Sequence, residues 1–293
     1  MTTDLGRLGV WAGLDAYSAR EAADFARKLE NWGYSALWTP EAVGRDPFTF
    51  IGYLAGQTER LVFATGIANI YARDPMTMKA ILQTMSELAA ERFVLGLGVS
   101  HQHLVSKIRG HDYQKPLTTM RNYLAAMEKA LYMGAAPEQT APIVLAALRD
   151  KMLGLAATQT AGAHPYLTPP EHTARARKVM GDSAWLCPEQ MVILETDAGN
   201  ARAVARKHLQ VYLSLPNYRN NLMQFGFDSA DFDDGGSNKL VDAIVAWGDE
   251  QAIADRIQAH RDAGANHVCI QTFRPDGKAG PDLRLLEALA PGP

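Results

Sequence analysis

The sequence predicts an α/β fold in which eight parallel strands, each followed by a helix, close into a (β/α)8 barrel. Three observations support this fold class. Short apolar runs alternate with segments of helical period about eight times along the chain. Most of the runs are apolar on both faces, as parallel strands covered by helices must be. A length of 293 residues, with 47% hydrophobic and 21% charged residues, suits a single barrel domain spanning residues 1–293.

The predicted elements follow one another in a regular order. The run LGVWAGL, residues 8–14, precedes a helical segment over 18–33, where Ala22, Phe25 and Leu29 recur at helix spacing and Gly33 ends the helix. The same alternation returns with the runs YSALWTPE, LVFATGIAN, FVLGLGVS, PIVLAAL, AHPYLTP, MVILETD and HVCIQTF. A helix over 246–264 is expected just before the last run. An open doubly wound sheet uses the same units in smaller number, so their count favours the closed barrel.

One long segment interrupts this order. Residues 215–248 separate the seventh helix from the last strand–helix unit, and a long insertion in a compact domain is usually a lid or an interface. Its polar tract DSADFDDGGS, residues 228–237, predicts a mobile loop. Its cluster PNYRNN, which includes Asn217 and Tyr218, either covers a pocket or caps a helix.

Composition narrows the possible partners. The formal net charge is −3, and the 29 basic and 32 acidic residues are scattered, so neither nucleic acid nor a membrane surface is expected to bind. No run reaches the roughly 20 apolar residues that span a bilayer, and no targeting segment is recognised at the N-terminus. Cys187 and Cys269 lack metal-site spacing, which predicts two core thiols, no metal site and a reducing cytoplasm.

The run FVLGLGVSH, residues 93–101, holds the most informative cluster. Gly96 and Gly98 fall in or at the end of the fourth predicted strand, so Ser100 and His101 lie at the face where barrel enzymes hold their chemistry. The third glycine of a dinucleotide fingerprint is missing. The two glycines therefore permit either a strand bulge or the close approach of a flat ligand. His103 is expected to face solvent. Trp11 walls the same pocket or fills the opposite end of the barrel.

Several short motifs together resemble a known family. They are GYSALWTPE, LVFATGIAN followed by R-x-P-M, ERFVLGLGVSH, PIVLAAL and GAHPY, and they span roughly residues 8–273. Their succession resembles the luciferase-like flavin and deazaflavin oxidoreductases, and is more closely similar to the members that use coenzyme F-420, a deazaflavin. The resemblance implies a barrel that holds a flat isoalloxazine-like ring across the carboxyl ends of its strands.

The resemblance also implies catalytic residues. Relatives often carry an acidic residue at the end of the second strand, where this chain has Pro40 and Glu41 in a departure from the pattern. Many deazaflavin-dependent relatives place a Glu after the G-x-G of the fourth strand, and the matching residue is His101. A histidine transfers protons with a pKa nearer neutrality. The proton-handling residue is therefore predicted to be His101 or Glu41.

Coenzyme contacts follow from the same resemblance. A bulge at the end of the third strand, often with a non-prolyl cis peptide, supports the ring in the family and falls here at residues 65–67. A turn after the fifth strand binds the coenzyme phosphate; here it keeps amides at a helix start and adds the cation of Arg149. The implied coenzyme-binding residues are Pro40, Thr65, Gly66, Ile67, Asn69, Gly98, Ser100, Ala146, Ala147, Leu148, Arg149, His164, Tyr166 and Thr168.

Three functions are compatible with the sequence. The first is an oxidoreductase that moves a hydride between coenzyme F-420 and a small organic substrate. The second is a luciferase-like monooxygenase that uses flavin mononucleotide (FMN), and the third is a barrel that binds coenzyme without turnover. A homodimer is expected because the helical segment MTMKAILQTMSELAA has more Met and Leu than one buried stripe requires.

Overall fold

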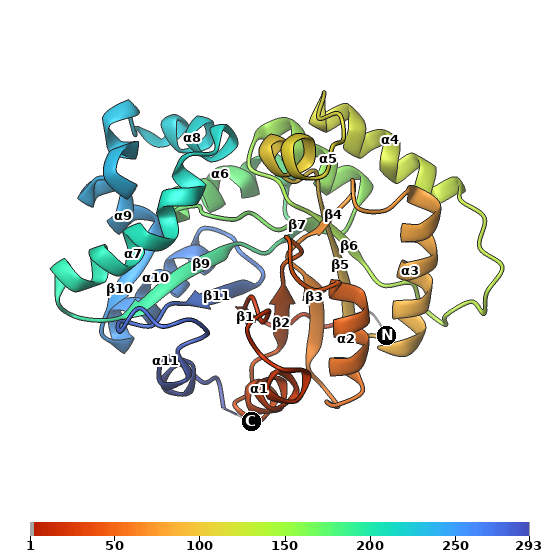
Figure 1. The fold of residues 1–293 in the computed structure, drawn as a ribbon, viewed down its shortest axis with the longest axis horizontal. Helices are drawn as coiled ribbons and strands as arrows, with labels where there is room; N and C mark the ends of the chain where they lie inside the picture. The colour runs from red at the N-terminus through yellow and green to blue at the C-terminus, as the bar shows by residue number, and fades with distance from the viewer. Residues whose placement is uncertain (1–2, 293) are drawn as a thin grey trace.

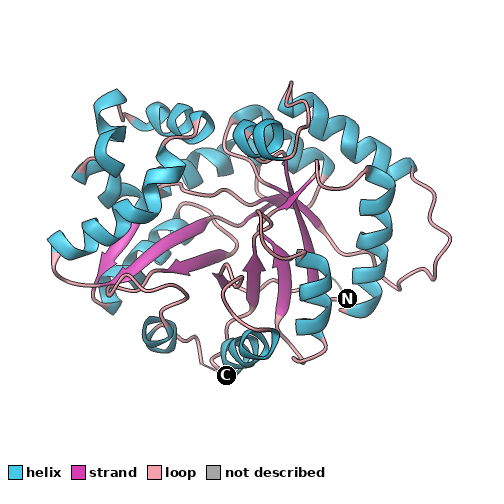
Figure 2. Ribbon diagram, in the orientation of Figure 1, coloured by secondary structure: helices cyan, strands magenta, loops and turns pink. Residues whose placement is uncertain are grey.

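A parallel sheet that curls on itself and is covered by helices organises residues 3–292, the part of the chain that the computed structural model describes (Figures 1 and 2). The strand order is β10-β9-β11-β1-β2-β3-β5-β6-β7-β8, with β4 paired to β5, and every pairing is parallel. The strands are β1 (Leu8–Trp11), β2 (Ala36–Thr39), β3 (Val62–Thr65), β4 (Ala68–Asn69), β5 (Phe93–Gly98), β6 (Ile143–Leu145), β7 (Gly162–Ala163), β8 (Trp185–Leu186), β9 (Glu189–Leu194), β10 (Val245–Gly248) and β11 (Val268–Thr272). The predicted alternation of parallel strands and helices is confirmed in this outline.

The seventh predicted strand, the run that begins at Met191, corresponds to β9, and the short strand β8 lies just before it outside every predicted run. β8 pairs with β7, whereas β9 pairs with β11 and β10, and only Cys187 and Pro188 separate β8 from β9. The Cys269 amide donates to the Pro188 carbonyl at 3.1 Å, and the Glu189 amide donates to the Pro165 carbonyl at 2.9 Å. One short stretch of chain therefore links β8, the last strand of the order, to β9, the second strand from its other end.

Helices follow most strands and cover the outside of the sheet (Figure 2). The first shows why they form: Ser18 and Glu21 make a capping box, and Ala22, Phe25 and Leu29 are buried on one face, as their spacing predicts. The helices are α1 (Ala19–Asn31), α2 (Pro47–Ala55), α3 (Pro75–Leu88), η1 (His103–Ile108), α4 (Pro116–Lys129), α5 (Asp150–Gln159), α6 (Pro170–Met180), α7 (Ala198–Leu213), α8 (Pro216–Leu222), η2 (Met223–Phe225), η3 (Ser229–Gly235), α9 (Asn238–Ile244), α10 (Glu250–Asp262) and α11 (Leu283–Ala288). None of those in the described chain combines the length and apolarity needed to cross a membrane.

The segment 215–248 is folded throughout, which corrects the prediction of a mobile loop. It forms α8, η2, η3 and α9 and ends in β10, which pairs with β9. In the polar tract, the side chain of Asp228 caps η3 and the Phe232 ring is buried. The cap and the buried ring hold the tract in place. The expected helix over 246–264 begins only at Glu250, because Asp249 caps it and the preceding residues are strand.

Candidate active site

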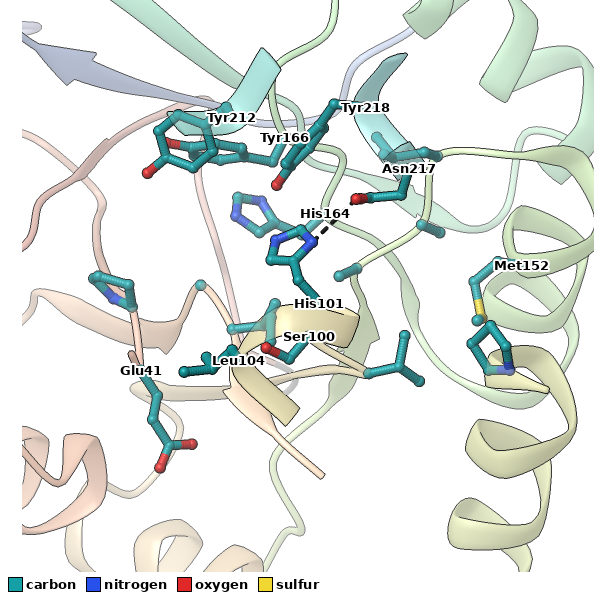
Figure 3. Close-up of a pocket in the computed structure, with 18 of the residues that line it drawn as sticks. Glu41, Ser100, His101, Leu104, Met152, His164, Tyr166, Tyr212, Asn217 and Tyr218 are labelled. Atoms are coloured by element: carbon teal, nitrogen blue, oxygen red, sulfur yellow. Dashed lines mark hydrogen bonds between the residues drawn. The ribbon is translucent and has the colours of Figure 1, made fainter. Parts of the chain in front are cut away.

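A cavity of about 310 Å³ opens at the carboxyl ends of the strands, where the barrel fold predicts chemistry (Figure 3). The last residue of β1 and the segments that follow β2, β3, β5, β6 and β7 contribute to it, and α7 and α8 lie across it. Its lining residues are Trp11, Pro40, Glu41, Ala42, Gly66, Ile67, Val99, Ser100, His101, Leu104, Tyr113, Pro116, Ala146, Ala147, Leu148, Arg149, Met152, His164, Tyr166, Tyr212, Asn217 and Tyr218. The described chain holds no cluster of three metal-ligating side chains.

The glycines of β5 let neighbouring parts of the chain approach closely. A Cβ on Gly96 would lie 1.9 Å from the Thr65 carbonyl oxygen, so this position accepts only glycine. A Cβ on Gly98 would lie 2.4 Å from Ile67 Cδ1 and 3.2 Å from Ala146 Cβ. The two glycines therefore seat β5 against the third-strand bulge. Gly98 does not itself line the cavity, although it was predicted to contact the coenzyme.

His101 stands inside the cavity on the segment that follows β5. Its Nδ1 lies 3.0 Å from Oδ1 of Asn217, and its ring packs against Tyr218 with centroids 5.3 Å apart (Figure 3). Burial lowers the pKa of His101, and the hydrogen bond to Asn217 raises it in part. The imidazole is therefore neutral near pH 7 and able to accept a proton. His103, two residues on, is exposed as predicted.

Gly66 and Ile67 line the cavity, and the peptide bond between them is cis, as the resemblance implies. The Trp11 indole N–H donates to the Gly66 carbonyl oxygen at 3.0 Å, which places Trp11 on the pocket side. A Cβ on Gly66 would meet Trp11 Nε1 at 2.6 Å and His164 Nε2 at 3.2 Å. The glycine is thus enclosed by two rings. Thr65 is buried behind it, with its hydroxyl donating to the Gly96 carbonyl at 2.7 Å, and does not line the cavity.

His164 presents an unsatisfied acceptor next to Gly66. Its Nδ1 is 2.7 Å from the Cys187 carbonyl oxygen and therefore carries the proton, and its ring stacks on Trp38 with centroids 4.4 Å apart. Its Nε2 is buried without a hydrogen-bond partner in the described chain. Burial lowers the pKa of His164 to about 4, so it stays neutral. A ligand N–H or O–H would satisfy this atom.

Glu41 lies at the wall, with both carboxylate oxygens engaged by protein groups. Oε1 pairs with Nη1 of Arg73 at 2.7 Å, and Oε2 accepts the Asn69 amide at 2.8 Å. In Figure 3 the carboxylate points away from the labelled rings. The Asn69 side chain is buried outside the lining, where its oxygen accepts the Tyr71 amide at 2.9 Å. This geometry favours His101 over Glu41 as the proton-handling residue.

The predicted phosphate end is built around the start of α5. Ala146, Ala147 and Leu148 line the cavity, and the exposed Arg149 precedes the helix. The Ala146 amide already donates to the Leu97 carbonyl at 2.8 Å, so it is not available to an anion, contrary to the prediction. The later amides and the Arg149 guanidinium are the remaining donors at this helix start.

Three tyrosines form the wall beside α7 and α8. Tyr166 packs against Tyr212 and Tyr218 with ring centroids 5.3 Å and 6.1 Å apart, and its hydroxyl donates to Gln271 Oε1 at 2.9 Å. Burial raises the pKa of Tyr166 well above its usual value. Thr168, predicted with Tyr166, is buried outside the lining.

Sequence reasoning missed part of the lining. Tyr113 lies in a loop, Met152 in α5 and Tyr212 in α7, all outside the motifs, and no local pattern marks them. Tyr113 reaches the site because its hydroxyl donates to the Ser100 carbonyl at 3.3 Å. The sequence cluster that holds Asn217 and Tyr218 is compatible with a pocket cover, but clusters of this kind more often cap helices. The structure brings both side chains to His101.

The family model of the luciferase-like monooxygenases matches residues 2–267. The chain belongs to this family. A Mycobacterium tuberculosis protein, named as a candidate coenzyme F-420-dependent oxidoreductase, is 30% identical over 118 residues, which is 40% of this chain and 33% of that protein. The chain thus matches about a third of the length of this relative.

Two solved structures show the same fold at low identity. One is an F-420-dependent secondary alcohol dehydrogenase in complex with an F-420–acetone adduct, with a TM-score of 0.76, 12% identity and coverage of 99% of this chain and 97% of that one. The other is the oxygenating constituent of 3,6-diketocamphane monooxygenase from Pseudomonas putida in complex with FMN. Its TM-score is 0.70 at 14% identity, and the match covers 98% of this chain and 97% of that one. Both deazaflavin and flavin proteins of the luciferase-like family therefore share this fold.

Proposed function

We propose that this protein is an oxidoreductase that exchanges a hydride between coenzyme F-420 and a small organic substrate, on a (β/α)8 barrel. The observation that carries the proposal is the placement of His101, a neutral and half-buried imidazole, inside the cavity at the carboxyl ends of the strands. The similarity to the Mycobacterium tuberculosis protein named as a candidate F-420-dependent oxidoreductase supports the coenzyme.

The cavity residues fit a flat heterocyclic ring. Gly66 lines the cavity with backbone alone, since Trp11 and His164 already fill the position of a Cβ, and His164 Nε2 is a buried acceptor without a partner in the described chain. Ile67 and Trp11 supply apolar surface beside them, and Arg149 lies at the helix start that would face a phosphate. When bound, a deazaflavin supplies hydride exchange.

The protein's own contribution is positioning, exclusion of water and proton transfer. Tyr166, Tyr212 and Tyr218 close one side of the cavity and keep water from it. His101 accepts a proton from a substrate hydroxyl when the substrate is oxidised, and returns it in the reverse direction. Glu41 stays ion-paired with Arg73 and shapes the wall.

A monooxygenase that uses FMN is the second candidate, because a structural neighbour binds FMN in the same fold. Titration of the purified protein with each coenzyme, followed by fluorescence quenching, separates the two. We expect micromolar or tighter binding of coenzyme F-420 and at least about tenfold weaker binding of FMN, a difference of about 1.4 kcal/mol. Equal or reversed affinities would contradict the proposal. Binding of F-420 without redox change across a substrate screen would instead identify a non-catalytic binder.

A further inference from the structure

We infer that Asn217 is a positioning residue for His101, whose imidazole it holds with Nδ1 protonated and with Nε2 left as the proton-accepting atom. The inference rests on the proposed function, since it gives a role in that reaction to a residue of the 215–248 segment. It also gives this segment a chemical task beyond closing the cavity.

The hydrogen bond between the two side chains decides which nitrogen carries the proton. His101 Nδ1 and Asn217 Oδ1 are 3.0 Å apart, across 116 positions of the sequence (Figure 3). An amide oxygen only accepts hydrogen bonds, so Nδ1 must be the donor. A neutral imidazole carries one N–H, and therefore Nε2 keeps its lone pair.

A second residue of the same helix fixes the plane of the imidazole. The Tyr218 ring packs against the His101 ring at 5.3 Å and against the Tyr212 ring at 5.8 Å. Tyr218 and Leu222 are buried, which anchors α8 on the core beneath it. The helix therefore presents one polar and one aromatic contact to His101 from a rigid base.

No carboxylate supplies this control instead. Among the described lining residues the charged side chains are Glu41 and Arg149, and Glu41 is paired with Arg73. The other titratable groups of the lining are the imidazole of His164, whose pKa burial lowers to about 4, and the phenols of Tyr113, Tyr166, Tyr212 and Tyr218, whose pKa burial raises, to about 12 for Tyr113. These phenols stay neutral near pH 7. The amide of Asn217 is thus the group that orders the tautomer of His101.

The test measures the tautomer directly in the coenzyme-free protein. Imidazole ¹⁵N NMR of histidine-labelled protein reports which ring nitrogen bears the proton, and His101→Gln assigns the signal among the eight histidines. We expect the parent to show an Nδ1-protonated His101 and Asn217→Leu to lose that preference toward the Nε2-protonated form. Asn220→Leu, at an exposed position of the same helix, is the matched control and should resemble the parent.

A second variant keeps the inference testable if Asn217→Leu fails to fold. Asn217→Asp preserves the acceptor and adds a negative charge, so the pKa of His101 should rise by about one unit or more in an NMR titration. The acid limb of the kcat–pH profile should move with it. An unchanged tautomer in Asn217→Leu, or an unchanged pKa in Asn217→Asp, would overturn the inference. Absence of F-420-dependent turnover in the parent would instead contradict the proposed function and leave the NMR result readable.

Discussion

The carboxylate of Glu41 and the guanidinium of Arg73 form a buried ion pair beside the cavity, with 2.7 Å between Oε1 and Nη1. The two side chains are 6% and 13% exposed, and Arg73 also pairs with Asp46. The pair ties the end of β2 to the segment before α3, so Glu41 supports the wall of the site.

Glu41→Gln should therefore cost stability more than chemistry. The variant leaves Arg73 with one carboxylate partner in place of two, and we expect the free energy of unfolding to fall by about 1 to 3 kcal/mol in urea titrations. Turnover per folded molecule should stay within a few-fold of the parent. Glu87→Gln, at an exposed position of α3, is the control. Loss of turnover by about a hundredfold or more, with stability and coenzyme binding intact, would return the proton-handling role to Glu41.

His101→Ala should lower turnover by about 10² to 10⁴, the range typical of a general acid or base. Coenzyme affinity should change little, because Gly66, Ile67 and the start of α5 form a separate part of the cavity. His103→Ala should have almost no effect, since this histidine is exposed. Steady-state kinetics and coenzyme titrations of both variants make the comparison. If His101→Ala mainly unfolds the protein, or if both variants turn over like the parent, then His101 is structural.

Gly96→Ala should destabilise the protein because the new Cβ would lie 1.9 Å from the Thr65 carbonyl oxygen. Neither backbone can move without breaking the pairing of β3 and β5. Overpacking of this kind costs about 1 to 3 kcal/mol or more, which urea unfolding would measure. Gly154→Ala, within α5 and with nothing within 4 Å of its Cβ position, should be neutral or stabilising. Equal stability of the two variants would show that β5 tolerates a side chain at Gly96.

The sequence predicted the strand–helix alternation because each apolar run is a local feature that a periodic pattern reveals. It also located most of the cavity, since the carboxyl ends of parallel strands share one face. Tyr113 and Tyr212 escaped prediction because tertiary packing alone brings them to the site. Glu41 lines the cavity as predicted, but its engagement with Arg73 depends on a contact across 32 positions that no local pattern encodes. The same holds for β10, whose pairing with β9 is a long-range contact.

Assembly as a homodimer remains a prediction, and exposed apolar side chains on α3 and after α4 mark a candidate interface. On α3, Met76 and Leu88 are 57% and 62% exposed, although the other face of the helix is buried. Beyond α4, Leu131 and Met133 are also exposed. We expect light scattering at micromolar concentration to give twice the chain mass of 32.0 kDa. Leu88→Glu should shift the mass toward the monomer, and a monomeric parent would contradict the prediction.

Glu189 should make the protein less stable as the pH rises from mildly acidic to alkaline. The side chain is buried at the start of β9, its Oε1 has no partner among the described residues, and Oε2 accepts the Leu167 amide at 3.3 Å. Burial raises the pKa of Glu189 from 4.5 to about 8. The folded state then holds a proton that the unfolded state has released. The contribution of Glu189 to the free energy of unfolding is complete below pH 4.5 and is lost as the pH rises toward 8.

Buried histidines make the folded protein less stable as the pH falls, the opposite dependence to that of Glu189. Burial lowers the pKa of His164, His172 and His267 to about 4 and that of His260 to about 3. Their contribution is present above the unfolded value of 6.5 and is lost as the pH falls toward 4. Together with Glu189 they predict that the stability of the parent passes through a maximum near neutral pH, where the histidines of the unfolded chain have lost most of their protons.

Glu189→Gln isolates the carboxyl group because the amide mimics the protonated form in shape and carries no charge. Variant and parent should have nearly equal free energies of unfolding at about pH 4, and the variant should become the more stable of the two by up to about 1.4 kcal/mol for each further pH unit toward 8. Urea titrations at a series of pH values measure the difference. Glu287→Gln, at an exposed position of α11, controls for general charge effects. A difference between Glu189→Gln and parent that stays constant with pH would show that Glu189 is ionised in the folded protein.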